Sequence, residues 1–187
     1  MLAALLAGWL LLPAVAAADS AVDASAPSGS GLVILVRHAE KSAQASDPPL
    51  SAPGGARALA LRDALAGFSL AGIIVSDTRR TLQTAAPTAA LHQLTPIVAS
   101  TASGMPAHVA DIVQRVHELS GQGAVLVVGH SNTLPAVVKA LGGSPLLDLA
   151  ECEFDTLWLL DLRDAESPPG LIRVRYGAPS ACDSATR

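Results

Sequence analysis

The segment 32–40 constrains the fold of this chain more than any other. Its first five residues, Leu-Val-Ile-Leu-Val, are aliphatic, and Arg37 and His38 follow them at once. An aliphatic run of this length, rich in β-branched residues, is typical of a strand buried on both faces of a parallel sheet. In open α/β sheets, ligands bind beyond the carboxyl ends of such strands. The sequence therefore places Arg37 and His38 where a ligand would bind.

Short aliphatic runs and segments of helical periodicity alternate along the rest of the chain. The expected strands are 71–75, 96–99, 124–128, 156–160 and 171–174, and the expected helices are 51–65, 78–90, 109–116 and 132–141. Such alternation predicts βαβ units with right-handed crossovers. We therefore expect a three-layer α/β sandwich, in which a largely parallel central sheet is flanked by helices.

Polar residues and a proline predict details of two of these helices. Ser51 is placed to cap the first helix, and Ser76 or Asp77 to cap the second, because their side-chain oxygens accept hydrogen bonds from unpaired helix N–H groups. Pro87 lies inside the second helical segment. It predicts a kink or an early end there, since proline cannot donate a helix hydrogen bond.

The N-terminal segment has the pattern of an export signal. Residues 1–18 carry no charged side chain, and an apolar run at 2–12 precedes a group of alanines. This pattern is typical of a secretory signal peptide, and an uncleaved membrane anchor is the alternative. Residues 19–31 are then a flexible linker, 32–178 a single domain and 179–187 a tail. We expect an exported protein, periplasmic or secreted, that contacts a membrane only if residues 1–18 are retained.

Charge and cysteine content bear on possible partners. The net charge of −4 argues against nucleic-acid binding, which needs clustered basic residues. Export would allow Cys152 and Cys182 to form a disulfide, and two unpaired thiols are the alternative. Neither cysteine has a second cysteine or a histidine at zinc-ligand spacing, so a structural metal is not expected.

Polar residues follow two further expected strands. The segment 76–80 contains Arg80 and follows the strand 71–75, and His130 follows the strand 124–128. Both segments also open helices, whose first N–H groups and partial positive charge favour an anion. Together with Arg37 and His38, they describe a pocket for a dianionic phosphate.

Four segments resemble, in order and spacing, the motifs of the histidine phosphatase superfamily, the phosphoglycerate mutase-like proteins. Val36–Glu40 is similar to the Arg-His-Gly motif, and Leu50–Gly54 to the Leu-Ser/Thr-x-x-Gly helix start. Ser76–Ala85 is similar to the Ser-x-x-x-Arg-x-x-Gln-Thr-Ala segment, which places the second arginine at Arg80 and not Arg79. Gly129–Thr133 resembles the second histidine motif. The resemblance covers residues 32–176.

The resemblance implies a phosphoglycerate mutase-like fold and a phosphatase without metal or cofactor. His38 would be the nucleophile, forming a covalent phosphohistidine that water hydrolyses. Arg37 and Arg80 would bind the phosphate, and His130, if protonated, would add a third positive charge. Other phosphate-binding residues would be Ser131 and Asn132. The substrate would be a phosphomonoester or a phosphoramidate, in a small molecule or a phosphoprotein.

Two features depart from the family pattern. Ala39 stands where the family usually has glycine, so the backbone there must avoid a conformation that only glycine adopts easily. The segment 81–109, where many members carry the acid that protonates the leaving group, holds no acidic residue. Glu40 and His108 are the candidate general acids. A substrate with a good leaving group, such as phosphohistidine or an acyl phosphate, would need none.

Three other functions remain open from the sequence. A phosphomutase is disfavoured by the short chain and by the missing acid. A non-catalytic phosphate-binding module is disfavoured by the intact His38. A metal-dependent hydrolase using His38 and His130 would lack the usual carboxylate cluster. The oligomeric state is not predicted.

Overall fold

The structure is a computed structural model that describes residues 31–182, apart from 44–45, 147–148 and 164–167. The predicted leader, the linker as far as residue 30 and the end of the tail lie outside the described residues. None of the described helices is both long enough and apolar enough to cross a membrane.

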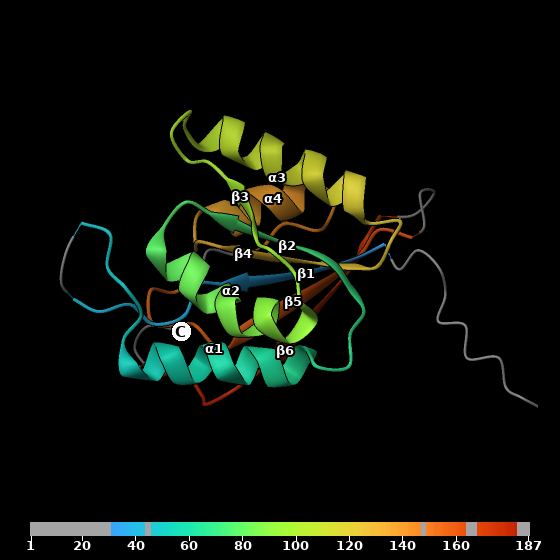
Figure 1. The fold of residues 1–187 in the computed structure, drawn as a ribbon. Helices are drawn as coiled ribbons and strands as arrows, with labels where there is room; N and C mark the ends of the chain where they lie inside the picture. The colour runs from blue at the N-terminus through green and yellow to red at the C-terminus, as the bar shows by residue number, and fades with distance from the viewer. Residues whose placement is uncertain (1–30, 44–45, 147–148, 164–167, 183–187) are drawn as a thin grey trace, which may run out of the picture.

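One sheet of six strands forms the centre of the described chain (Figure 1), in the order β3-β2-β4-β1-β5-β6. The strands are β1 (Leu32–Arg37), β2 (Leu70–Ser76), β3 (Ile97–Ala99), β4 (Ala124–Gly129), β5 (Thr156–Asp161) and β6 (Gly170–Arg175). The parallel pairs are β1 with β4, β2 with β4 and β2 with β3. β5 pairs antiparallel with both β1 and β6. The predicted α/β class with a largely parallel sheet is confirmed.

Helices cover both faces of this sheet, α1 and α2 on one side and α3 and α4 on the other (Figure 1). Their bounds are α1 (Ala52–Leu65), α2 (Arg79–His92), α3 (Met105–Leu119) and α4 (Thr133–Ala140). Val33 and Leu35 of β1 pack in the core cluster that contains residues of α3 and α4. Ile34 and Val36 pack in the cluster that contains residues of α1 and α2. β1 is therefore buried on both faces, as its aliphatic run predicted.

Of the two outcomes predicted for Pro87, the early end of the second helix was wrong, and the kink stays a prediction. α2 continues through Pro87 to His92. Thr84, Ala85, Thr88 and Ala89 are all buried around this proline, so tertiary packing holds the helix despite the missing hydrogen bond.

The predicted cap of this helix was also wrong. Its N-cap is Thr78, which makes no side-chain cap bond within the described structure. Asp77 instead accepts hydrogen bonds from Ser100 and Thr101. Asp77 thus fixes the loop after β3.

The start of α1 fits closely against the residues that follow β1. The Ser51 hydroxyl accepts a hydrogen bond from the Gly54 N–H at 3.2 Å, which confirms the predicted cap. Ser51 also donates to the carbonyl of Glu40 through its backbone N–H, at 2.9 Å. A Cβ atom at position 54 would lie 2.1 Å from that same carbonyl oxygen. Glycine at 54 therefore lets α1 approach the polar end of β1.

We expect Gly54→Ala to lower the free energy of unfolding by about 2 kcal/mol or more, since the added methyl group overpacks this contact. Gly55→Ala is the matched control, because a Cβ there meets no described atom within 4 Å. Alanine is also the better helix former by about 1 kcal/mol, so Gly55→Ala should leave stability unchanged or raise it. Urea unfolding measures both variants, and equal effects would contradict the proposed close contact.

Candidate active site

The polar residues predicted to form a site lie at one edge of the sheet. β2, β4 and β1 are neighbours, and they end at Ser76, Gly129 and Arg37. The His38 N–H donates to the Gly129 carbonyl at 2.9 Å, which extends the pairing of β1 with β4. The ring centroids of His38 and His130 consequently lie 5.3 Å apart. Parallel pairing thus brings the two histidine motifs together.

His38 is a buried, neutral imidazole. Its side chain is almost fully buried, and its Nδ1 lies 2.8 Å from the carbonyl oxygen of Ala39. Burial, together with the nearby His130, Arg37 and Arg80, lowers the pKa of His38 to about 3, against the opposing effect of the hydrogen bond to Ala39. In the neutral tautomer that fits this contact, Nδ1–H donates to Ala39 and Nε2 keeps its lone pair.

The backbone after His38 is held without a glycine. The Ala39 N–H donates to the Thr84 hydroxyl of α2 at 2.9 Å. Gln93 is the non-glycine residue with positive φ among those described, so Ala39 does not adopt the glycine-favoured conformation. The departure from the family's glycine is therefore compatible with the fold.

His130 connects the ends of two strands. Its Nε2 lies 2.9 Å from the Ser76 hydroxyl, and its Nδ1 lies 3.5 Å from Nη2 of Arg80. Burial, followed by the charge of Arg80, lowers the pKa of His130 to about 4. His130 is therefore neutral at pH 7 and adds no third positive charge to the ligand-free protein.

Arg37 is held by a distant segment of the chain. Its Nη1 donates to the carbonyls of Ala150, Glu151 and Glu153, at 2.9, 3.0 and 3.2 Å. Its guanidinium carbon lies 4.3 Å from the ring centroid of Phe154, a cation–π distance. Nη2 reaches the exposed carboxylate of Glu151 at 3.2 Å. The Nε–H of Arg37 is buried and has no hydrogen-bond partner within the described chain.

Arg80 has a similar environment. Its Nη1 lies 3.5 Å from Asp47, whose carboxylate also accepts a hydrogen bond from the backbone N–H of Arg79. The Nε–H of Arg80 is likewise buried without a partner among the residues described. The arginine that faces His130 is thus Arg80, as the motif alignment implies. Arg37 and Arg80 thus each have a buried Nε–H without a described partner. Each also contacts a solvent-accessible carboxylate, that of Glu151 for Arg37 and that of Asp47 for Arg80.

A cavity of about 300 Å³ opens next to His130. The described residues that line it are Thr78, Arg80, Thr101, Met105, His108, His130, Asn132 and Thr133. Asn132 therefore reaches the cavity, whereas Ser131, Arg37 and His38 are not among these residues. The described part of the chain also holds no group of three His, Cys, Asp or Glu side chains arranged to bind a metal ion.

The two candidate general acids differ in their surroundings. Both carboxylate oxygens of Glu40 accept hydrogen bonds from Arg57, at 2.7 to 3.0 Å. Arg57 is itself buried and also donates to the carbonyls of Tyr176 and Ala178. His108 is almost fully buried in the cavity wall, and neither ring nitrogen has a partner in the described structure. Of the two, His108 is the one with free hydrogen-bonding groups at the cavity.

The contributors to this site that sequence reasoning did not predict include Asp47, Ser76 as the partner of His130, Glu151 and Phe154. Glu151 and Phe154 reach Arg37 across more than 110 residues of sequence. No local pattern marks such contacts. The Ser76 contact had a signal, because Ser76 begins the segment that contains Arg80.

A family model matches part of the chain. Residues 33–102 match the model of the histidine phosphatase superfamily (branch 1), a stretch that includes His38 and Arg80 but ends before His130. No curated protein matches the chain significantly.

Three solved structures share the fold over most of their length. The protein histidine phosphatase SixA complexed with tungstate is 18% identical, with a TM-score of 0.60, over 77% of this chain and 96% of that one. A candidate α-ribazole-5′-P phosphatase from Escherichia coli is 19% identical, with a TM-score of 0.60, over 81% and 98%. A candidate phosphohistidine phosphatase SixA from Nakamurella multipartitia is 25% identical, with a TM-score of 0.53, over 79% and 95%. By its motifs, its family match over residues 33–102 and its fold, the chain is similar to the histidine phosphatase superfamily.

Proposed function

We propose that this protein is a metal-independent phosphatase that transfers a phosphoryl group to His38 and then hydrolyses the phosphohistidine. The observation that carries the proposal is the state of His38. Its ring is neutral, its Nδ1 is occupied by the Ala39 carbonyl, and it lies beside His130 among the charges of Arg37 and Arg80. A neutral imidazole with one nitrogen fixed is an activated nucleophile.

The reaction then has two steps. Nε2 of His38 attacks phosphorus, so that an N–P bond forms while the bond to the leaving group breaks. The unused Nε–H donors of Arg37 and Arg80 are available to phosphate oxygens, and such charge-assisted hydrogen bonds stabilise the charge that develops in the transition state. Water next attacks the phosphohistidine, which releases inorganic phosphate and neutral His38.

The cavity favours a substrate with a good leaving group. No carboxylate lies among the described residues that line it, and Glu40 is engaged by Arg57. We infer that His108 donates the hydrogen bond to a leaving group, and that a phosphoramidate such as phosphohistidine is a better substrate than an alkyl phosphate. A volume of about 300 Å³ is at the small end of ligand pockets and suits a small group of this kind. The likeness to structures described as phosphohistidine phosphatases supports this choice.

We also propose that the enzyme works outside the cytoplasm. The structure pairs Cys152 with Cys182 in a disulfide, with their Cα atoms 5.3 Å apart. Disulfides persist in oxidising compartments, and the apolar segment 1–18 has the pattern of an export signal. Detection of the mature protein in the periplasmic or culture fraction tests this location.

The proposed function is tested by turnover of a phosphoramidate in the presence of EDTA, with kcat measured from pH 8 to pH 5. We expect turnover in EDTA. We also expect that protonation of His38 does not lower kcat between pH 8 and pH 5, because the pKa of about 3 keeps its imidazole neutral throughout. A nucleophile with the ordinary pKa of about 6.5 would lose about thirtyfold of its active form by pH 5. Spontaneous hydrolysis of the substrate is subtracted at each pH.

The same pH range also affects stability. The folded-state pKa values of His38 and His130 lie below the ordinary histidine value of 6.5, so the unfolded chain binds more protons below pH 6.5 and the free energy of unfolding falls as the pH falls. Circular dichroism at each pH checks that the protein remains folded.

No turnover of any phosphorylated substrate by the folded protein would favour a phosphate-binding module, and activity lost in EDTA would favour a metal-dependent hydrolase.

A further inference from the structure

The turn that holds Arg37 is not part of any helix or strand. Residues 150–154, here called the Arg37 turn, lie between α4 and β5. The Glu153 N–H donates to the Ala150 carbonyl at 2.9 Å and closes the turn. The carbonyls that accept from Arg37 belong to this turn. The position of the guanidinium therefore depends on what holds the turn in place.

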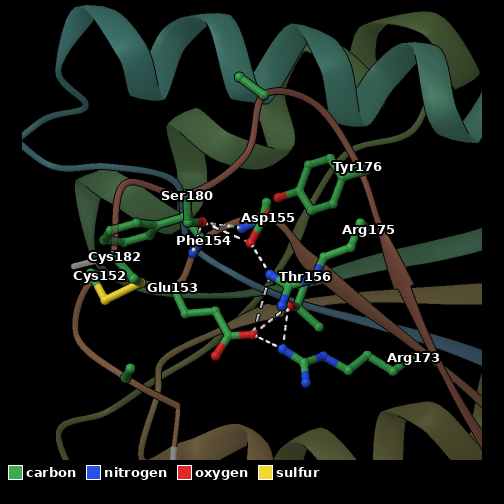
Figure 2. A network of polar contacts seen from close by, with 12 residues as sticks. Cys152, Glu153, Phe154, Asp155, Thr156, Arg173, Arg175, Tyr176, Ser180 and Cys182 are labelled. Carbon is green, nitrogen blue, oxygen red and sulfur yellow. Dashed lines mark hydrogen bonds and ion pairs between the residues drawn. A yellow bond between two sulfur atoms is a disulfide. The ribbon is translucent and has the colours of Figure 1, made fainter. Parts of the chain in front are cut away.

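Two kinds of contact join the Arg37 turn to the C-terminal segment 177–182 (Figure 2). Cys152 in the turn is bonded to Cys182. The Ser180 hydroxyl accepts hydrogen bonds from the backbone N–H groups of Phe154 and Asp155, at 2.8 and 3.0 Å. The same hydroxyl donates to the Asp155 carboxylate at 2.7 Å. The turn and the C-terminal segment thus form one cross-linked unit.

A second set of contacts joins the turn and the start of β5 to β6. The carboxylates of Glu153 and Asp155 pair with Arg173 and Arg175 (Figure 2). Both arginines have about half of their side chain exposed, whereas the side chains of Glu153 and Asp155 are largely buried. The segment 177–182 forms neither helix nor strand and is mostly exposed. The disulfide is the covalent link between this segment and the Arg37 turn.

We infer that the Cys152–Cys182 disulfide positions Arg37 for binding a phosphate oxyanion. The disulfide fixes the Arg37 turn, the carbonyls of the turn fix Nη1 of Arg37, and the buried Nε–H of the same guanidinium is left free for an oxygen of the ligand. Reduction breaks the S–S bond without removing any group that touches the ligand. The inference rests on the proposed function for the identity of the ligand, and it makes phosphate affinity depend on the thiol–disulfide state.

The test compares the full chain in its oxidised and reduced forms. Dithiothreitol supplies two electrons and two protons, so that Cys152 and Cys182 become thiols and the reagent becomes its cyclic disulfide. Affinity for inorganic phosphate is measured calorimetrically in both forms without air, together with KM and kcat. We expect reduction to raise the Kd for phosphate by about fivefold or more, a typical size for coupling between two sites. KM should rise in parallel.

The effect of reduction in the Arg37→Ala variant distinguishes a change in the position of Arg37 from a general loss of rigidity in the protein. If the disulfide acts through Arg37, reduction should leave the already weak phosphate affinity of Arg37→Ala unchanged. A further loss of the same size in that background, or equal affinity of both wild-type forms, would overturn the inference. The double variant with Cys152→Ser and Cys182→Ser should match the reduced protein and not respond to dithiothreitol. Melting curves establish that every form is folded at the assay temperature.

Binding and turnover fail separately in this experiment. Phosphate affinity that depends on the disulfide, in a protein without turnover, would support the inference and reject the phosphatase. Turnover by a protein whose phosphate affinity does not depend on the disulfide would support the phosphatase and reject the inference.

Discussion

His38→Ala should reduce turnover of a phosphoramidate by about 10⁴-fold or more, the range seen when a catalytic nucleophile is removed. His38 contributes Nε2 as the attacking atom, and its neighbour His130 cannot replace it, because its two ring nitrogens already contact Ser76 and Arg80. Rapid quenching at alkaline pH should trap a phosphorylated protein from the wild type. The variant should yield none.

His117→Ala is the matched control for this experiment. His117 lies on α3 with its side chain exposed, so its removal should change neither turnover nor the trapped phosphoprotein. Circular dichroism should show that His38→Ala remains folded, because alanine at this buried position removes polar atoms without adding volume. Full activity of folded His38→Ala would reject His38 as the nucleophile and with it the covalent mechanism.

Arg80→Ala should weaken vanadate inhibition and lower kcat/KM by about 10²-fold or more, because a preorganised charged donor is removed from the transition state. The side chain of Arg80 faces His130, and its buried Nε–H has no partner among the described residues. Arg80→Lys should recover little of the loss, since lysine keeps the charge but not the planar fork of donors. The inhibition constant of vanadate, measured in EDTA, reports this binding directly.

Arg79→Ala separates the specific contact from the net charge of this region. Arg79 precedes Arg80 at the first turn of α2, and its side chain is exposed. Its contact with Asp47 is made by the backbone N–H, which the substitution keeps. Arg79→Ala should therefore retain vanadate affinity and kcat/KM to within about twofold, which is the scale of a screened surface charge. Similar losses in both variants would mean that the region acts only through its overall charge.

The parallel part of the fold could be predicted because it depends on local patterns. Residues 33–36 of β1 are aliphatic and buried, two on each face of the sheet, and the helices between the strands show their own periodicity. The direction of β5 could not be predicted in this way. An aliphatic run has the same composition in either direction, so only the path of the chain after α4 decided that β5 runs antiparallel to β1.

The choice between Glu40 and His108 also depended on the tertiary structure. Glu40 lies within a motif segment and His108 between two of them, and both side chains can carry a proton. Arg57 on α1 engages both oxygens of Glu40, whereas His108 is left without a described partner in the cavity wall. A hydrogen-bond partner that another helix or strand supplies cannot be recognised from the local sequence.

The sequence by itself predicted that Arg37 and His38 end a buried strand, and that Arg80 and His130 each closely follow another strand of the same kind. Parallel strands place their carboxyl ends at one edge, so these local patterns were sufficient to predict that the four residues meet. Only the tertiary structure decided how Arg37 is held. The carbonyls that fix it belong to a turn 113 to 116 residues away, and a disulfide to the C-terminal segment holds that turn. Contacts across such distances depend on where the folded chain returns, which no short stretch of sequence encodes.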